Sequence, residues 1–322
     1  MTGKSVSFRA TLLGAVGAMA IIAGSNTAQA AGLAYAYLEI NDFAIYHSGV
    51  APGALGTQYA VTDFTVLNIG NSGSTSATLS GFGNAVFGVA GSVGPVDVVQ
   101  ACVGIGCPGQ NSFAQTGAGH FARADMSLAG QIITPPPGST ATAKTVSELR
   151  LTSNGVGGPN VGTVGTTSGF RLAAADSILF DFDAITNLLV GITGIDEAGN
   201  MLASNSFTIS ITDGIGGTVF EWTPDGTVNS SIIGGTEYAD GSDLTRSISY
   251  AIPPNPLGTT VYSPGEQHFR AQTGLLTAGV DYTLSISHNS TTNGILRVPE
   301  PATLGLLGLG LMALGAGAIR RR

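Results

Sequence analysis

Basic residues are scarce in this chain, which has 12 Lys and Arg against 20 Asp and Glu in 322 residues. Five of the basic residues lie near the two chain ends, so residues 31–297 hold only seven, against nineteen acidic residues and a net charge of about −12. Nucleic acids and anionic membrane surfaces are bound through basic patches, which argues against nucleic acid as a partner. The balance is typical of a soluble, self-repelling surface protein, or of one that recruits cations.

Cysteine is also rare, with only Cys102 and Cys107. In an oxidising compartment, the simplest interpretation of two cysteines this close together is a disulfide that closes a small loop. A short loop removes little unfolded-state entropy, so the bond is expected to contribute about 2 kcal/mol or less. A metal site is the rival interpretation, and it is disfavoured because His120, the nearest histidine, has no second cluster of ligands near it in sequence. The expected role of the disulfide is local shape.

Familiar catalytic motifs are missing. No serine stands in a Gly-x-Ser-x-Gly sequence, and no His-Glu-x-x-His pair is present. The histidines are scattered, and each is expected to be a strand or loop residue near the surface: His47, His120, His268 and His288. Gly104–Gly109 fits the dinucleotide-binding pattern, but Pro108 and the glycines that follow exclude the long helix which that pattern requires. We therefore expect no cofactor and no enzymatic activity.

Paired carboxylates are the best candidates for chemistry. Asp181 and Asp183 flank Phe182 in a strand-like run, so both carboxylates are expected on one face of a strand. Such a pair can serve glycoside hydrolysis or bind calcium, although a solvated strand face is the favoured interpretation. Asp240 and Asp243 are interpreted first as turn residues and only second as weak calcium ligands. A secreted hydrolase acting on polysaccharide, with Asp181 and Asp183 as its carboxylates, is the alternative function.

Aromatic side chains could instead form a platform for sugar rings, which would make the chain a carbohydrate-binding protein. The candidates are Tyr35, Tyr37, Tyr46, Trp222 and Tyr262. Trp222 is the only tryptophan, and buried packing is the commoner fate of a lone tryptophan in a strand. The sequence leaves both interpretations open.

Sustained helical periodicity is absent between residues 31 and 297, where alternating patterns dominate. Phe207–Thr212 and Tyr282–Ser287 alternate bulky apolar with small hydroxyl residues, which predicts strands with one buried face. Similar stretches predict strands at 34–46, 59–69, 96–102, 121–128, 145–151, 177–185, 218–223, 244–252 and 260–271. We predict one all-β domain over residues 31–297, an antiparallel β-sandwich or jelly-roll-like fold, in preference to a parallel β-helix.

Three stretches are predicted to lie outside the strands. Thr134–Gly138 contains three consecutive prolines and is expected to form an exposed polyproline-like loop. Ser153–Gly169 is rich in glycine and is expected to form a mobile surface excursion. Asn71-Ser72-Gly73 is predicted to be a turn, because Asn, Ser and Gly favour the backbone conformations of tight turns.

The N-terminus has the layout of a signal peptide over residues 1–30. Lys4 and Arg9 form a small basic region, Ala10–Gly24 is apolar, and Ala28-Gln29-Ala30 supplies small residues at the −3 and −1 positions. Signal peptidase is therefore expected to cleave just before Ala31. The chain is predicted to be exported by the secretion machinery.

The C-terminus combines three features in order. Pro299-Glu300-Pro301 is expected to stay extended and accessible, because both prolines have a fixed φ and lack a backbone donor. The residues Thr303–Ile319 carry no charge, and a transmembrane helix of that length would cover roughly 25 Å, slightly less than a hydrocarbon core. Arg320, Arg321 and Arg322 favour the cytoplasmic side of a membrane, which puts the body of the protein on the opposite side.

This tail, residues 298–322, resembles the PEP-CTERM sorting signal of Gram-negative bacteria. The resemblance implies that an exosortase, a membrane protease, recognises Pro299, Glu300 and Pro301 and removes the helix and the basic end. It also implies a protein anchored on the periplasmic side of the inner membrane before processing, and located at the cell surface or outside the cell afterwards. An ordinary C-terminal membrane anchor is the alternative interpretation.

Two segments of the body, Leu38–Phe43 and Gly279–Ile286, are similar to a subset called exosortase-dependent surface proteins. That similarity implies a surface or matrix role without established catalysis. We therefore expect a structural or adhesive component of the cell surface, of the extracellular matrix or of a biofilm. The resemblance also implies matrix polysaccharide as a partner, because exosortase systems often accompany exopolysaccharide production.

Overall fold

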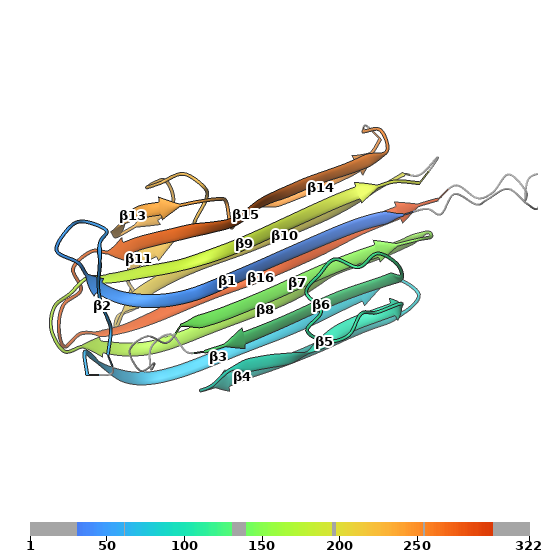
Figure 1. Ribbon diagram of the computed structural model, residues 1–322. Helices are drawn as coiled ribbons and strands as arrows, with labels where there is room; N and C mark the ends of the chain where they lie inside the picture. Colours follow the sequence, from blue (N-terminus) through green and yellow to red (C-terminus); the bar gives the residue numbers. More distant parts are fainter. Residues whose placement is uncertain (1–30, 61, 131–139, 195–197, 254, 299–322) are drawn as a thin grey trace, which may run out of the picture.

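The computed structural model describes residues 31–60, 62–130, 140–194, 198–253 and 255–298. In these ranges the secondary-structure elements are all β-strands. The strands form two antiparallel sheets that pack face to face (Figure 1). The predicted all-β antiparallel sandwich is confirmed. Its longest strands run along the long axis of the molecule, so the sandwich has two ends and two lateral edges (Figure 1).

The first sheet, sheet A, contains eight strands. They are β1 (Gly32–Ser48), β2 (Leu55–Gln58), β5 (Val96–Ile105), β6 (His120–Ala129), β7 (Ala141–Leu151), β9 (Ile178–Ile192), β13 (Gly235–Asp240) and β15 (Gly258–Thr273). Their order across the sheet is β13-β15-β9-β1-β7-β6-β5, and β2 pairs with the end of β1.

The second sheet, sheet B, also contains eight strands. They are β3 (Phe64–Leu79), β4 (Gly83–Ser92), β8 (Gly155–Leu172), β10 (Ala198–Asp213), β11 (Thr218–Trp222), β12 (Ile232–Ile233), β14 (Ser247–Ile252) and β16 (Asp281–Arg297). Their order is β12-β11-β10-β16-β8-β3-β4, and β14 pairs with β10. Every stretch predicted to be a strand overlaps one of the strands of the two sheets.

The expected surface excursion at Ser153–Gly169 is wrong, because most of that segment belongs to β8, an inner strand of sheet B between β16 and β3. Its glycines allow close packing. A Cβ on Gly162 would lie 2.6 Å from the carbonyl oxygen of Asp125 in sheet A, and one on Gly157 would lie 2.2 Å from Leu149 Cδ1. Glycine here lets the two sheets approach each other, although its abundance in the sequence suggested a loop.

The turn predicted at Asn71-Ser72-Gly73 is also wrong, since these residues lie inside β3. The side chain of Asn71 is buried and donates from Nδ2 to the carbonyl oxygen of Gly94 at 2.9 Å. Gly73 faces sheet A, where a Cβ would lie 2.6 Å from Met126 Cε. Residues that favour turns therefore serve contacts between the sheets here.

Both ends of the described chain meet at one end of the sandwich. β1 begins there and β16 ends there, on opposite sheets (Figure 1). A Cβ on Gly32 would lie 3.5 Å from Leu296 Cδ1, and the carbonyl oxygen of Ala31 accepts a hydrogen bond from the Thr193 N–H at 3.0 Å. We name this end the tail pole, and the other end, where β1 ends and β16 begins, the distal pole.

The space between the sheets holds two large apolar clusters. The cluster nearer the distal pole is rich in aromatic residues, among them Phe180, Phe182 and Trp222, and the cluster nearer the tail pole is mainly aliphatic. A belt of buried polar side chains lies between the two: Thr145, Ser147, Asn160, Thr186, Asn205, His288, Ser290 and Thr292. Its members bond to one another, as when Ser290 donates to Asn205 Oδ1 at 2.8 Å. Hydrogen bonds between buried polar groups of this kind tie the sheets together at a defined register.

Several predicted features lie outside the described residues. These are the signal peptide with Ala28 and Ala30, the loop Thr134–Gly138, and the tail from Pro299 to Arg322. Within the described ranges, no helix has the length and apolar character needed to cross a bilayer.

Candidate functional site

Asp181 and Asp183 project from β9 on the outer face of sheet A, on the side opposite the buried Phe182. His268 on the neighbouring β15 lies between them, with Nε2 3.3 Å from Asp181 Oδ2 and Nδ1 2.9 Å from Asp183 Oδ1. Arg270 donates from Nε to Asp181 Oδ2 at 2.6 Å. The side chains of Asp183 and His268 are 40% and 44% exposed and that of Asp181 is 17% exposed, so the group lies at the surface with Asp181 as its most covered carboxylate.

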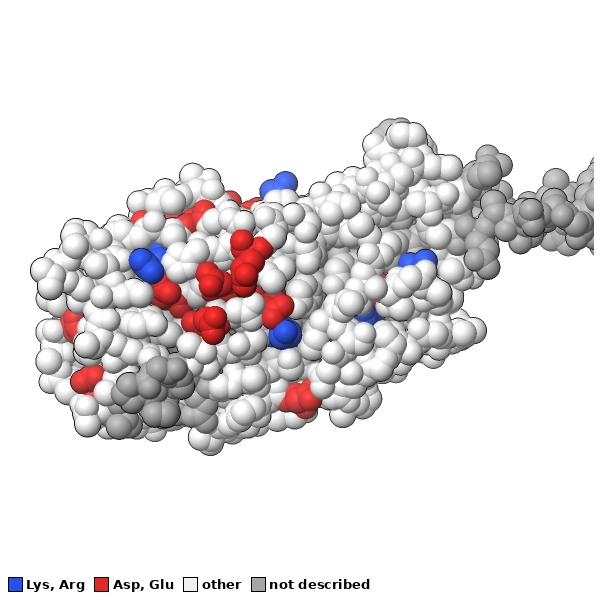
Figure 2. Space-filling view, viewed as in Figure 1, with Lys and Arg blue, Asp and Glu red and all other residues white. Residues whose placement is uncertain are grey.

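Acidic side chains gather on this face over the half of the sandwich nearer the distal pole (Figure 2). Glu39 on β1 belongs to the same face and pairs with Lys144 on β7 at 2.6 Å. Burial acts to raise the pKa of Glu39, but Lys144 and the hydroxyl of Tyr37 lower it below its usual value. Glycosidase carboxylates flank the scissile bond from two sides, whereas Asp181 and Asp183 project from one strand face and are engaged by basic side chains.

Asp240 and Asp243, the weaker calcium candidates, accept hydrogen bonds from loop amides. Asp240 Oδ2 accepts from three successive backbone N–H groups, those of residues 225–227, at 2.8–3.0 Å. Burial, and next the nearby Glu237 carboxylate, raise the pKa of Asp240 to about 6. Asp243 Oδ1 accepts from the Thr245 N–H at 2.9 Å. Across the residues that the structure describes, no group of three or more His, Cys, Asp and Glu side chains is placed to hold a metal ion.

The aromatic candidates are largely occupied by intramolecular contacts. Trp222 is fully buried in the core, and its indole N–H donates to the buried Glu237. The ring of Tyr262 is covered on one side by the guanidinium of Arg246, which lies 4.4 Å from its centroid. Tyr46 is half-buried on β1. Trp222 therefore has no free face for a sugar ring. The structure supports the interpretation that this tryptophan packs in the core.

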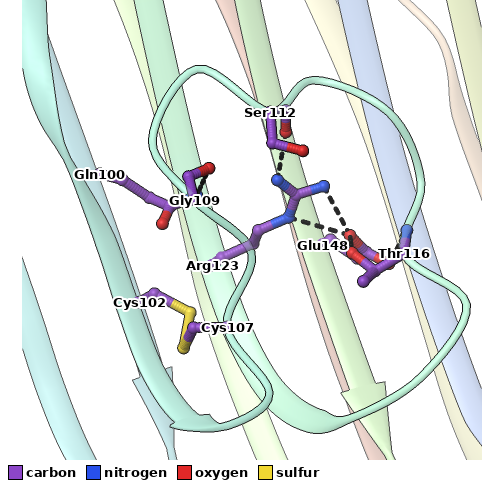
Figure 3. The surroundings of a disulfide bond; sticks show 8 residues. All are labelled: Gln100, Cys102, Cys107, Gly109, Ser112, Thr116, Arg123 and Glu148. Atoms are coloured by element: carbon purple, nitrogen blue, oxygen red, sulfur yellow. Dashed lines mark hydrogen bonds and ion pairs between the residues drawn. A yellow bond between two sulfur atoms is a disulfide. The ribbon is translucent and has the colours of Figure 1, made fainter.

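Cys102 and Cys107, the predicted disulfide pair, are bonded to each other at the start of the loop that joins β5 to β6 (Figure 3). This loop, residues 106–119, folds over the outer face of sheet A. The hydroxyl of Tyr35 donates to the carbonyl oxygen of Phe113 at 2.6 Å, and the ring of Tyr37 packs against the Phe113 ring at a centroid distance of 6.2 Å. The loop thus buries two of the candidate aromatics.

Under the same loop lies an ion pair that the sequence did not single out. Arg123 on β6 and Glu148 on β7 have side chains that are 0% exposed, with Arg123 Nη2 2.7 Å from Glu148 Oε2 (Figure 3). Arg123 also donates to the carbonyl oxygens of Ser112 and Ala114, and Glu148 accepts from the N–H and the hydroxyl of Thr116 at 3.0 and 2.8 Å. Loop groups thus satisfy a buried ion pair, which would otherwise be costly. Both faces of β6 are buried over Phe121–Met126, which places the Arg123 side chain in this environment.

A second unpredicted cluster lies at the distal pole. The imidazole of His47 contacts Asp176 Oδ2 through Nδ1 at 2.5 Å and Asp63 Oδ2 through Nε2 at 3.2 Å. Tyr59 donates its hydroxyl to Asp176 at 2.8 Å. A hydrogen bond from the N–H of Ala60, together with His47, lowers the pKa of Asp63. The cluster joins the end of β1 to the loops before β3 and β9, and its Asp176 lies 129 residues after His47 in the sequence.

His288 contradicts the expectation that every histidine lies near the surface. Its side chain is buried in the polar belt, where Nε2 lies 3.0 Å from the carbonyl oxygen of Leu38 and 2.9 Å from Thr145 Oγ1. Burial lowers its pKa to about 3. His288 is therefore neutral at physiological pH and has a role in joining the two sheets.

The outer face of sheet B differs from that of sheet A in carrying hydroxyl and amide groups. We define the hydroxyl face by the outward residues of four adjacent strands: Ser72, Ser74 and Ser76 on β3, Thr163 and Thr167 on β8, Ser204, Ser206, Thr208 and Ser210 on β10, and Thr283, Ser285, Ser287, Asn289 and Thr291 on β16. The charged residues of these strands lie at strand ends: Arg171, Asp213, Asp281 and Arg297. The hydroxyl face is thus an uncharged surface on an acidic protein.

The sequence of the tail identifies how the protein is handled. Residues 297–322 match the family described as the PEP-CTERM protein-sorting motif. The chain carries a PEP-CTERM sorting tail. This motif implies export, anchoring in a membrane before processing, and an exosortase as the processing partner. The PEP-CTERM tail begins at Arg297, the last residue of β16, so it continues directly from an inner strand of sheet B.

Other comparisons add no argument about fold or function. No curated protein matches the chain. A VP2 subviral particle of infectious bursal disease virus is 12% identical, covers 90% of this chain and 75% of that one, and has a TM-score of 0.11. A structure of the Gx strain of the same virus is 13% identical, covers 88% of this chain and 70% of its own, and has a TM-score of 0.10. TM-scores this low show no common fold.

Proposed function

We propose that this protein is a structural or adhesive component of the cell surface or extracellular matrix, released by an exosortase at Pro299-Glu300-Pro301. The observation that carries the proposal is that both ends of the sandwich lie at the tail pole, where Gly32 and Leu296 are neighbours. Only Val298 separates the last residue of β16 from Pro299. The sandwich is therefore joined to its sorting tail with almost no linker.

Two attachments at one pole set the orientation of the protein before processing. The predicted signal peptide and the predicted membrane helix both connect to the tail pole, so the sandwich stands on the periplasmic side with its distal pole away from the membrane. Release requires no rearrangement of the sandwich, because cleavage occurs outside both sheets. The outer faces and the distal pole are then available for contacts at the cell surface.

The hydroxyl face supports a contact with matrix polysaccharide. Ser206, Asn289, Thr163 and Ser74 stand in register across β10, β16, β8 and β3. Because neighbouring strands are about 4.8 Å apart, such a row extends across roughly 14 Å. Hydroxyl and amide groups both donate and accept hydrogen bonds, as sugar hydroxyls do. The lack of charge avoids the desolvation cost that would oppose contact with a neutral polymer.

Affinity electrophoresis in gels that contain polysaccharide from the producing cells tests this contact. We expect the native protein to be retarded and the Ser287→Glu variant, altered at an exposed position of the hydroxyl face, to migrate faster. Thr260→Glu on β15 is the matched control, since it adds the same charge at an exposed position of sheet A. If all three proteins migrate alike, with or without polymer, the adhesive part of the proposal is wrong.

Mass spectrometry of the mature C-terminus tests the sorting part. We expect the surface-exposed protein to lack Arg320, Arg321 and Arg322, and Glu300→Ala to accumulate unprocessed in the membrane. Recovery of surface protein that ends at an intact Arg322 would exclude processing. This result is independent of polysaccharide binding, so each part of the proposal can fail alone.

We propose a non-catalytic role over the hydrolase alternative, because Asp181 is only 17% exposed and is engaged by Arg270 and His268. The purified protein is expected to release no reducing ends from matrix polysaccharide. Activity that disappears in Asp181→Asn or Asp183→Asn, while the circular dichroism spectrum is unchanged, would favour the hydrolase instead.

A further inference from the structure

The lateral edge formed by β4 is exposed and unprotected. β4 is the last strand of sheet B and pairs with β3 alone among the described strands (Figure 1). It is ten residues long, from Gly83 to Ser92, and contains no charged residue and no proline. An edge strand directs the N–H and C=O groups of every second residue away from its neighbour, which makes it a template for another strand.

The opposite edge of the sandwich carries the protections that β4 lacks. In sheet A, β13 is six residues long, is interrupted by a bulge after Glu237 and ends at Asp240. The part of β15 beyond it contains Pro264, a bulge and the exposed Glu266. In sheet B, β12 has only two residues, and β14, which pairs with β10 alone among the described strands, has six. Short strands, bulges, proline and charge all discourage pairing between edges.

Apolar side chains are concentrated along the unprotected edge. Val86, Phe87 and Val89 on β4 are exposed, as is Phe82 in the turn before it. β5, the edge strand of sheet A at the same side, packs against β4 and exposes Val99. No charged residue occurs anywhere from Phe64 to Val96 in the sequence. Exposed apolar side chains gathered along an unpaired edge are typical of an interaction site.

We propose that β4 pairs antiparallel with β4 of a second copy of this chain about a two-fold axis. In such a pair, β4 of each copy forms backbone hydrogen bonds with β4 of the other, and the exposed apolar side chains of one copy pack against the same side chains of the other. Charge permits a second copy at this place, because β4 carries no charged residue that would repel its own equivalent. The chain has a formal net charge of −8, so copies repel one another, and repulsion is weakest where they meet along an uncharged edge.

The dimer joins sheet B of one copy to sheet B of the other as one continuous antiparallel sheet. The hydroxyl faces of the two copies then lie side by side, whereas the acidic faces of sheet A stay apart from the contact. The interface is distinct from the sorting tail, and it does not depend on whether the hydroxyl face binds polysaccharide.

Sedimentation equilibrium of the full chain in density-matched detergent tests this pairing. Val86→Lys puts a charge on the β4 edge, at a side chain that is 65% exposed, and Val261→Lys is the matched control on β15, where the side chain is 57% exposed. We expect the native chain and Val261→Lys to dimerise at micromolar concentration, and the dissociation constant of Val86→Lys to be at least 10-fold higher. Both variants add the same charge and keep the same tail, so only edge pairing separates them.

Hydrogen exchange on the native chain gives a second measurement that needs no variant. The amides of residues 83–92 are expected to exchange more slowly as the protein concentration rises, while those of 258–266 stay unchanged. The proposal is wrong if the native chain is monomeric at about 100 µM, if both variants weaken association equally, or if a dimer forms without protection of 83–92. If Val86→Lys does not fold, the exchange result alone decides.

Discussion

Acidification is expected to weaken this fold through His288, and the effect can be measured in isolation. Only 1% of this residue is exposed, its Nε2 lies 3.0 Å from the carbonyl oxygen of Leu38, and its Nδ1 has no hydrogen-bond partner. Burial disfavours the charged imidazolium and lowers the pKa to about 3, although the bond to Leu38 acts in the opposite direction. The neutral imidazole is therefore the form that the folded core accommodates.

The sign of the effect follows from comparing the folded and unfolded chains. In the unfolded chain the imidazole has its ordinary pKa of 6.5. Because the folded pKa is lower, the unfolded chain binds more protons between about pH 6.5 and pH 3, and the free energy of unfolding falls as pH drops through that window. Protonation of the unfolded imidazole lowers the free energy of unfolding by about 2 kcal/mol at pH 5 relative to pH 8. That is a sizeable part of the roughly 5–15 kcal/mol by which domains are stable.

Urea unfolding of the native protein and of His288→Gln at pH 8, 7, 6 and 5 measures this contribution. Glutamine keeps an N–H donor for Leu38 but does not titrate, so any packing loss is the same at each pH. We expect the stability advantage of the native protein to shrink by about 2 kcal/mol between pH 8 and pH 5. Asp240, with its raised pKa, favours the folded state as pH falls through about 6, but it is present in both proteins and cancels. A difference that stays constant across this range would refute a buried, neutral His288.

Three further predictions concern packing between and over the sheets. Glu148→Gln leaves the buried Arg123 without its counter-ion and is expected to cost about 3–5 kcal/mol in urea unfolding, with faster hydrogen exchange in residues 106–119; an unchanged midpoint would contradict burial of the pair. Replacing Cys102 and Cys107 with serine is expected to cost about 2 kcal/mol or less in the same assay, so a larger loss than for Glu148→Gln would show that the disulfide, and not the ion pair, holds the loop. Gly162→Val forces side-chain atoms against a carbonyl oxygen of sheet A, and is expected to cost about 1–3 kcal/mol or to prevent folding. If the variant has the same thermal unfolding midpoint as the native protein, the two sheets are further apart than the structure shows.

Much of the strand content was predictable because alternation is a local signal. The stretch Phe207–Thr212 has its apolar residues in the core and its hydroxyl residues on the outer face, as its pattern predicts. The pattern failed at Ser153–Gly169, where glycine and small polar residues occur on both faces of β8. Alternation disappears there because the inward positions are filled by small residues that bring the sheets together, and composition then resembles that of a loop.

The clusters of charged residues could not have been predicted in the same way. Arg123 and Glu148 are 25 residues apart, and His47 and Asp176 are 129 apart, so no spacing rule brings either pair together. Asp181 and Asp183 were found because every second position on a strand shares a face. His268, which lies between them, comes from another strand and was placed there by the pairing of β15 with β9.

The amino-acid sequence by itself determined the export route and the strand class, because a sorting tail and an alternating strand are both encoded in contiguous residues. The tertiary structure decided which side chains share an environment, because pairing between distant strands sets their register. It placed both chain ends at the tail pole, buried His288 between the sheets, gave sheet B an uncharged hydroxyl face and left β4 as an open edge. Each of these features depends on hydrogen bonds and contacts between strands that are remote in sequence.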